Sequence, residues 1–150
     1  MPLTPKETSL LKDLTDTEQL CVQKYTDYAS RAHDPQLKNL FSEIAAIERG
    51  HLQILQDMQS GKNPSAPSGS VTPPTFSAVY TAGESAEKKD DAYFCADLLA
   101  TEKHASHLYD TCVFEFTTAE ARDTLNGIQK SEQGHGKMLY DYMAQNAMYG

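Results

Sequence analysis

Two short segments of the chain pair a glutamate with a histidine three residues later, a combination that can bind a metal ion. They are Glu48-Arg49-Gly50-His51 and, 84 positions further on, Glu132-Gln133-Gly134-His135. Residues three apart on a helix project from one face, so each pair could offer a carboxylate oxygen and an imidazole nitrogen to one ion. Two such pairs could hold two ions.

The same offset superposes other parts of the two halves without a gap. Thr17-Glu18 matches Thr101-Glu102, and Tyr25 matches Tyr109. The identities are few, but they fall at helical spacings of three, four and seven on the predicted inward faces. Their placement, rather than their number, indicates an internal repeat.

Four segments carry the apolar spacing of amphipathic helices, and we predict helices over about 5–31, 35–59, 86–116 and 118–145. The first begins with the capping box Thr4-Pro5-Lys6-Glu7, and the fourth with a second box, Thr117-Thr118-Ala119-Glu120. Between the first two, Asp34-Pro35 supplies an N-cap and a proline at the first helical position. Turns this short predict two antiparallel helical hairpins.

The segment from about 60 to 85 joins the hairpins, and prolines, serines and glycines dominate it. About twenty-five residues can extend well over ~40 Å, enough to run the length of a helix. A flexible tether between independent hairpins is the alternative, but neither hairpin could bury its apolar stripe alone. The predicted fold is all-α: one domain, 1–150, forming an antiparallel four-helix bundle from two repeated hairpins and a long crossover.

The interior of this bundle would collect six polar side chains: Glu18, Glu48, His51, Glu102, Glu132 and His135. Antiparallel pairing brings Glu18 level with Glu48 and Glu102 level with Glu132, because each pair flanks its turn symmetrically. Four carboxylates in an apolar core repel one another and lose hydration, whereas two divalent cations would balance their charge. We therefore predict that these six residues bind metal.

Oxygen-rich ligation with two imidazoles suits iron or manganese better than the closed tetrahedra typical of zinc. We expect two divalent ions as cofactors, iron first and manganese next. A vestigial site with water or protonated carboxylates in place of metal is the alternative. Tyr25 and Tyr109 each follow a site glutamate by seven residues, so their phenols either hydrogen-bond a ligand carboxylate or belong to the core.

Other conspicuous residues are assigned weaker roles. Gly50 and Gly134 lie mid-helix, where each is about 1 kcal/mol less favourable than alanine, which suggests close helix approach or room for a ligand. His104 and His107 are expected at the surface or in a groove. Glu43 is excluded from the site because its repeat position is a glycine.

Composition excludes several classes of partner. The net charge of −8 leaves no basic patch for nucleic acid or an anionic membrane. No apolar stretch approaches the roughly 18 residues that span a bilayer, so we expect a soluble cytoplasmic protein. The three cysteines form no Cys-x-x-Cys pair, which predicts buried reduced thiols at Cys21, Cys95 and Cys112.

Two phrases resemble the spore coat F-like family within the ferritin-like superfamily: Asp97-Leu98-Leu99-Ala100-Thr101-Glu102-Lys103-His104 and Tyr140-Asp141-Tyr142-Met143. Asp13-Leu14-Thr15-Asp16-Thr17-Glu18 echoes the first. The resemblance implies a ferritin-like bundle in which the six residues match the superfamily's di-iron ligands. It also implies that Tyr25 matches a tyrosine found two turns after the first ligand in ferritins and bacterioferritins.

Two functions from different classes follow. The first is a redox protein that handles dioxygen, peroxide or ferrous iron, with ferroxidase, peroxidase or catalase-like turnover. The second is a structural or interaction protein of the spore coat, in which the metal site is only structural or vestigial. Its partners would be a second copy of the chain or spore coat proteins, and its location the spore coat if the source forms endospores.

Overall fold

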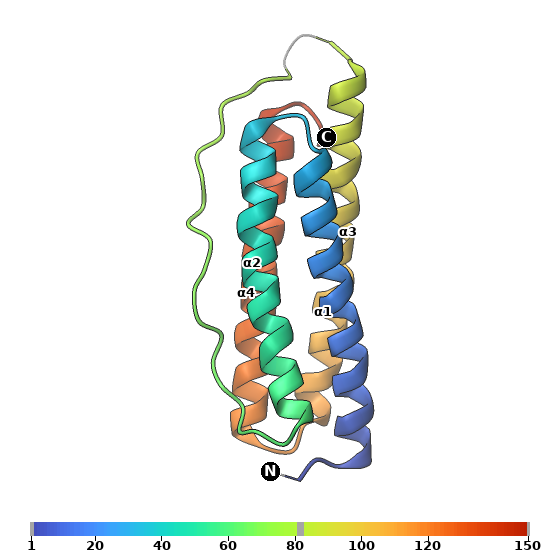
Figure 1. Ribbon diagram of the computed structural model, residues 1–150, viewed down its shortest axis with the longest axis vertical. Helices are drawn as coiled ribbons and strands as arrows, with labels where there is room; N and C mark the ends of the chain where they lie inside the picture. The colour runs from blue at the N-terminus through green and yellow to red at the C-terminus, as the bar shows by residue number, and fades with distance from the viewer. Residues whose placement is uncertain (1, 81–82, 150) are drawn as a thin grey trace.

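The computed structural model describes residues 2–80 and 83–149, and within them the regular elements are all helical. The helices are α1 Pro5–Arg31, α2 Pro35–Gln59, α3 Ala86–Glu115 and α4 Ala119–Gln145. α1 and α2 form one antiparallel hairpin, and α3 and α4 form the other. The hairpins pack into a four-helix bundle, with α1 against α3 and α2 beside α4 (Figure 1). None of the described helices is long and apolar enough to cross a membrane.

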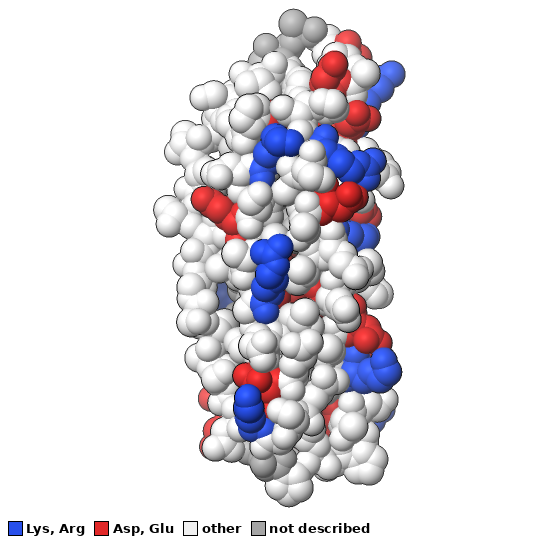
Figure 2. Space-filling view, viewed as in Figure 1, with Lys and Arg blue, Asp and Glu red and all other residues white. Residues whose placement is uncertain are grey.

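The crossover lies along the outside of α2 and α4 from one end of the bundle to the other (Figure 1). Two side chains make hydrogen bonds with the backbone near the C-terminal end of the crossover. Asn146 Oδ1 accepts hydrogen bonds from the backbone N–H groups of Val79 and Tyr80, at 2.8 and 3.1 Å, and Gln36 exchanges two hydrogen bonds with the backbone of Ser77. Residues 63–83 carry no charged side chain, so the crossover presents a largely uncharged strip (Figure 2). This segment is a packed crossover rather than a free tether.

The helix starts follow the predicted caps, with one exception. Thr4 and Glu7 form the predicted capping box of α1, and Asp34 caps α2. The second predicted box is wrong, because Thr118 rather than Thr117 is the N-cap of α4. The backbone N–H and hydroxyl of Thr117 instead donate to Glu7 of the other hairpin, at 2.8 and 3.1 Å.

This contact has a counterpart at the opposite end of the bundle. The carboxylate of Asp91 accepts hydrogen bonds from the backbone N–H groups of His33 and Asp34, at 2.9 and 3.0 Å. The 84-residue offset relates Asp91 to Glu7 and His33 to Thr117. An acidic side chain near the start of each hairpin therefore accepts hydrogen bonds from backbone N–H groups in the turn of the other hairpin. These contacts join the two repeats at both ends of the bundle.

The apolar core consists of two clusters, one on each side of the middle of the bundle. One contains Tyr25, Phe41 and Leu139, and the other contains Leu14 and Leu125. Tyr93 of α3, whose place in the apolar pattern also predicts an inward position, lies outside the core and is 62% exposed. The three cysteines are free and buried, in agreement with the prediction.

Candidate metal centre

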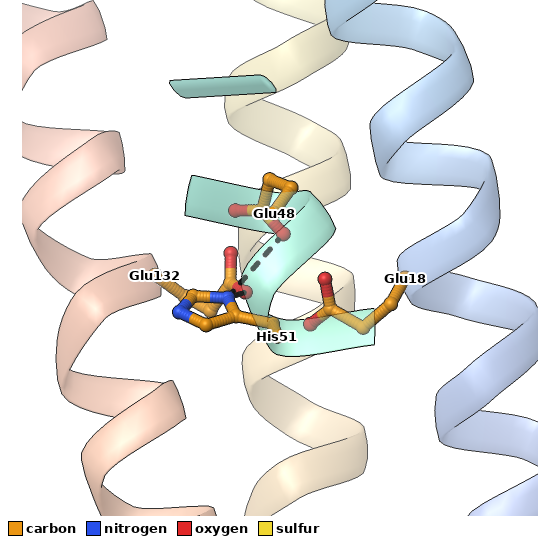
Figure 3. Close-up of side chains that lie close together, drawn as sticks. All are labelled: Glu18, Glu48, His51 and Glu132. Atoms are coloured by element: carbon orange, nitrogen blue, oxygen red, sulfur yellow. Dashed lines mark hydrogen bonds and ion pairs between the residues drawn. The ribbon is translucent and has the colours of Figure 1, made fainter. Parts of the chain in front are cut away.

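The four helices bring all six predicted residues to the level between the two apolar clusters. α1 contributes Glu18, and α3 contributes Glu102. α2 and α4 each contribute a glutamate and a histidine one turn apart. None of the six residues is more than 2% exposed. In Figure 3, Glu18, Glu48, His51 and Glu132 extend from three helices toward a common centre.

The cluster divides into two groups of possible ligands. The ligand atoms of each group lie within 4.8 Å of one another, and the groups are Glu18, Glu48, His51 and Glu132, and Glu48, Glu102, Glu132 and His135. The 84-residue offset converts one group into the other. Glu48 and Glu132 belong to both groups, so these two carboxylates lie where they could bridge two ions.

The imidazoles cross between the repeats. His51 Nδ1 lies 3.2 Å from Glu132 Oε1, and His135 Nδ1 lies 2.8 Å from Glu48 Oε1. Each Nδ1 is farther from the glutamate of its own helix, at 3.6 Å for His51 and 3.8 Å for His135. Both imidazoles therefore direct Nδ1 toward the shared carboxylates.

Two fully buried tyrosines also make hydrogen bonds between the two repeats. Tyr25 donates to Glu102 Oε1 at 2.6 Å, and Tyr109 donates to Glu18 Oε1 at 2.5 Å. The sequence allowed such bonds but did not identify which glutamate each phenol would contact. Each tyrosine orients the glutamate of the facing helix rather than the one on its own helix.

Several buried polar atoms of the cluster form no hydrogen bond, although His135 Nδ1 and Glu48 Oε1 lie 2.8 Å apart as an ion pair. Within the described residues these are Glu18 Oε2, both carboxylate oxygens of Glu48, Glu102 Oε2, Glu132 Oε2, His51 Nε2 and His135 Nδ1. Buried polar atoms are nearly always hydrogen-bonded, because burying one without a partner costs about 1–3 kcal/mol. Four carboxylates and two imidazoles form the donor set that divalent iron and manganese accept. The residues present therefore fit a pair of such ions.

Without metal, the cluster must hold protons. Burial, followed by the charge of Glu48, raises the pKa of Glu18 well above its ordinary value, and burial with the charges of Glu18 and Glu48 does the same for Glu132. Burial works against the ionisation of Glu48, but its interactions with Glu18 and the two imidazoles outweigh burial and lower its pKa. Burial would lower the pKa of His135, yet its contacts with Glu102 and Glu48 raise that pKa to about 9.

The remaining residues singled out from the sequence lie outside the cluster. Glu43, His104 and His107 are exposed. A Cβ at Gly50 or Gly134 would meet no atom within 4 Å, so close helix approach, one of the two explanations offered for these glycines, is wrong.

One neighbour of the cluster was not assigned to it from the sequence. Cys21 is fully buried one turn after Glu18. Burial, followed by the charges of Glu18 and Glu48, raises the pKa of its thiol. Its position three residues after Glu18 was the available signal.

The model of the Coat F domain family matches residues 90–150. The match covers most of α3 and all of α4, and it includes Glu102, Tyr109, Glu132 and His135. No curated protein and no solved structure matches the chain. The second hairpin is thus similar to a Coat F domain.

Proposed function

We propose that the chain is a ferritin-like dinuclear metal protein that binds two divalent ions, iron in preference to manganese, between its hairpins. Glu18 with His51, and Glu102 with His135, would each bind one ion, and Glu48 and Glu132 would bridge the two. The observation that carries the proposal is the pair of repeat-related ligand groups, in which several buried oxygen and nitrogen atoms form no hydrogen bond.

Redox handling of dioxygen, peroxide or ferrous iron is the activity that this donor set supports best. Bound ions would supply the electrons for such chemistry. The chain itself would hold the ligands in place through Tyr25 and Tyr109, and its two apolar clusters would exclude water. Glu132 can hold a proton on Oε2, which has no hydrogen-bond partner and belongs to a carboxyl whose pKa is raised by burial.

Bridging can be tested by electron paramagnetic resonance of protein loaded anaerobically with Mn(II). Two ions that share Glu48 and Glu132 should give a spin-coupled spectrum. The spectrum of isolated Mn(II) ions at full loading would contradict the bridged arrangement. Redox activity is a separate test: iron-loaded protein should consume hydrogen peroxide faster than a Glu48→Gln, Glu132→Gln double variant.

The second candidate function is a structural or interaction role in a spore coat, with metal used only for stability. The Coat F match favours this role more directly than any comparison favours redox chemistry. Large exposed aromatic side chains, among them Phe114 at 85% and Tyr93 at 62%, offer surfaces for assembly. A metal-loaded protein that is inert to peroxide, loses its fold on chelation and is found in the coat fraction of spores would establish this role.

A further inference from the structure

An open groove of about 520 Å³ lies between α3 and α4, beside the cluster. Glu102 and Glu132 line it, and so do the exposed side chains of His107 and Asp110. The Oε2 atoms of both glutamates are buried and have no hydrogen-bond partner. The groove is therefore open to the surface, and its floor is formed in part by two glutamates of the site, whose Oε2 atoms lie just beneath it.

The corresponding groove of the first hairpin carries larger side chains. The 84-residue offset relates Gly136, which lines the α3–α4 groove, to Leu52, and it relates Ser106 to Val22. Leu52 and Val22 are both partly buried. A Cβ at Gly136 would meet only Leu99 Cδ1, at an ordinary contact distance of 3.5 Å, so packing does not require this glycine.

A hydrogen bond also spans the first groove. Arg49, at the position related to Gln133, donates to Thr26 Oγ1 at 3.0 Å and so connects α2 to α1. The cavity beside this pair, of about 430 Å³, is lined by Thr26 and Arg49 but not by Glu18 or Glu48. The two repeats therefore contribute equivalent ligands, but only the groove of the second hairpin is lined by site glutamates.

The charged residues that line the α3–α4 groove differ from those that line a third cavity. A space of about 460 Å³ between the crossover and α4 reaches His135, but it is lined by Lys130 and by no carboxylate. Three carboxylates and one lysine line the α3–α4 groove. Oxygen ligands and a net negative lining attract divalent cations, whereas a lone ammonium group repels them.

We infer that divalent cations reach the site through the α3–α4 groove, which Gly136 keeps open. The inference rests on the proposed function, because it requires a site that binds such ions. His107 and Asp110 are three residues apart on α3 and present an imidazole and a carboxylate at the mouth of the groove. Glu102 and Glu132 then receive the ion at its inner end.

The chain supplies a matched pair of variants, since Gly134 and Gly136 flank His135 on the same helix. Gly136→Leu fills the α3–α4 groove, whereas Gly134→Leu places the same side chain in the cavity under the crossover. The measurement is anaerobic stopped-flow uptake of Co(II), followed by its visible absorption, with the final stoichiometry determined by dialysis. Gly136→Leu should slow uptake by at least about tenfold, because access would then need local opening of the bundle. Gly134→Leu should take up Co(II) at the wild-type rate.

The rates of Co(II) uptake by the wild type and the two variants test this route. Equal rates in all three proteins, or slowing by Gly134→Leu alone, overturn the groove as the route and leave the proposed function intact. A wild-type protein that binds no Co(II) overturns both. Gly136→Leu could lower the final stoichiometry or fail to fold. In that case Ser106→Val, which introduces the residue found at the related position of the first hairpin, replaces it, and its uptake rate is compared with that of the wild type.

Discussion

Tyr25 of α1 donates a 2.6 Å hydrogen bond to Glu102 of α3, so the first hairpin supplies the partner of a carboxylate in the second. Tyr109 and Glu18 make the reciprocal bond at 2.5 Å. The histidines cross between the repeats in the same way, from His51 to Glu132 and from His135 to Glu48. Neither hairpin alone contains a complete ligand group, and assembly of the site therefore requires docking of the hairpins.

Replacing Tyr25 by phenylalanine should destabilise the metal-free protein. Glu102 Oε1 would lose its hydrogen-bond donor in a fully buried position, which is expected to lower the free energy of unfolding by about 1–3 kcal/mol. Urea denaturation at pH 7 measures the change. Tyr28→Phe is the matched control, because its partner Asp97 is 25% exposed and keeps its contact with Lys24. We expect the control to lose less than about 1 kcal/mol, and equal losses would contradict the importance of burial.

Neutralising the two glutamates that belong to both groups of possible ligands, Glu48 and Glu132, should have unequal effects on the metal-free protein. The pKa of Glu48 is lowered and its carboxylate lies 2.8 Å from His135, so Glu48→Gln, which removes one partner of a buried ion pair, should lower the free energy of unfolding by about 3–5 kcal/mol. Burial raises the pKa of Glu132 and so favours its neutral form, which glutamine resembles in charge and shape; Glu132→Gln should therefore lower the free energy of unfolding by less than about 1 kcal/mol. Urea denaturation of both variants after chelation tests the contrast. Equal destabilisation would show that the two carboxyls hold the same charge.

Metal affinity should rise with pH. Burial raises the pKa values of Glu18 and Glu132, which favours their protonated forms in the metal-free protein, and contacts with Glu102 and Glu48 raise the pKa of His135 to about 9. A bound cation must displace these protons, so affinity falls as acidity increases and binding at pH 7 releases protons. Titration calorimetry in two buffers of different ionisation enthalpy measures the release. Binding without proton release at pH 7 would contradict these protonation states.

The contribution of Glu7 to stability should disappear in acid. Burial opposes its ionisation, but hydrogen bonds from Thr4 and Thr117 outweigh burial and lower its pKa. A carboxyl whose pKa is lower in the folded state stabilises the protein above its unfolded pKa of about 4.3 and loses this effect as pH falls through the folded value. Glu7→Gln should therefore be less stable than wild type at pH 7 and equally stable at low pH. The exposed Glu120→Gln is the control, and a deficit for Glu7→Gln that did not change with pH would refute this role.

The helices and the clustering of the six site residues could be predicted because they depend on local information. Apolar spacing defined the inward faces, and proline with capping residues defined most of the starts. The antiparallel turn then placed Glu18 level with Glu48. These steps need only helix geometry, which is the same in every bundle.

Contacts between the hairpins could not be predicted, because they depend on how the two hairpins pack against each other. Thr117 had the local signature of a cap, but a tertiary partner, Glu7, takes its hydroxyl, so α4 begins one residue later. The partner of Tyr25 depends on how α1 and α3 rotate against each other, which spacing along one helix does not define. The relation between Glu7 and Asp91 was visible in the 84-residue offset, although only the structure reveals that both cap a facing turn.

The most direct test of the account is the metal content of the protein after anaerobic reconstitution with ferrous iron and removal of loosely bound ions. Elemental analysis should find about two ions per chain in the wild type and fewer in the Glu48→Ala, Glu132→Ala double variant, because both ligand groups share these two carboxylates. Circular dichroism of the variant confirms that it is folded. A folded wild type that retains no iron or manganese would contradict the metal centre and leave the structural role as the function of this bundle.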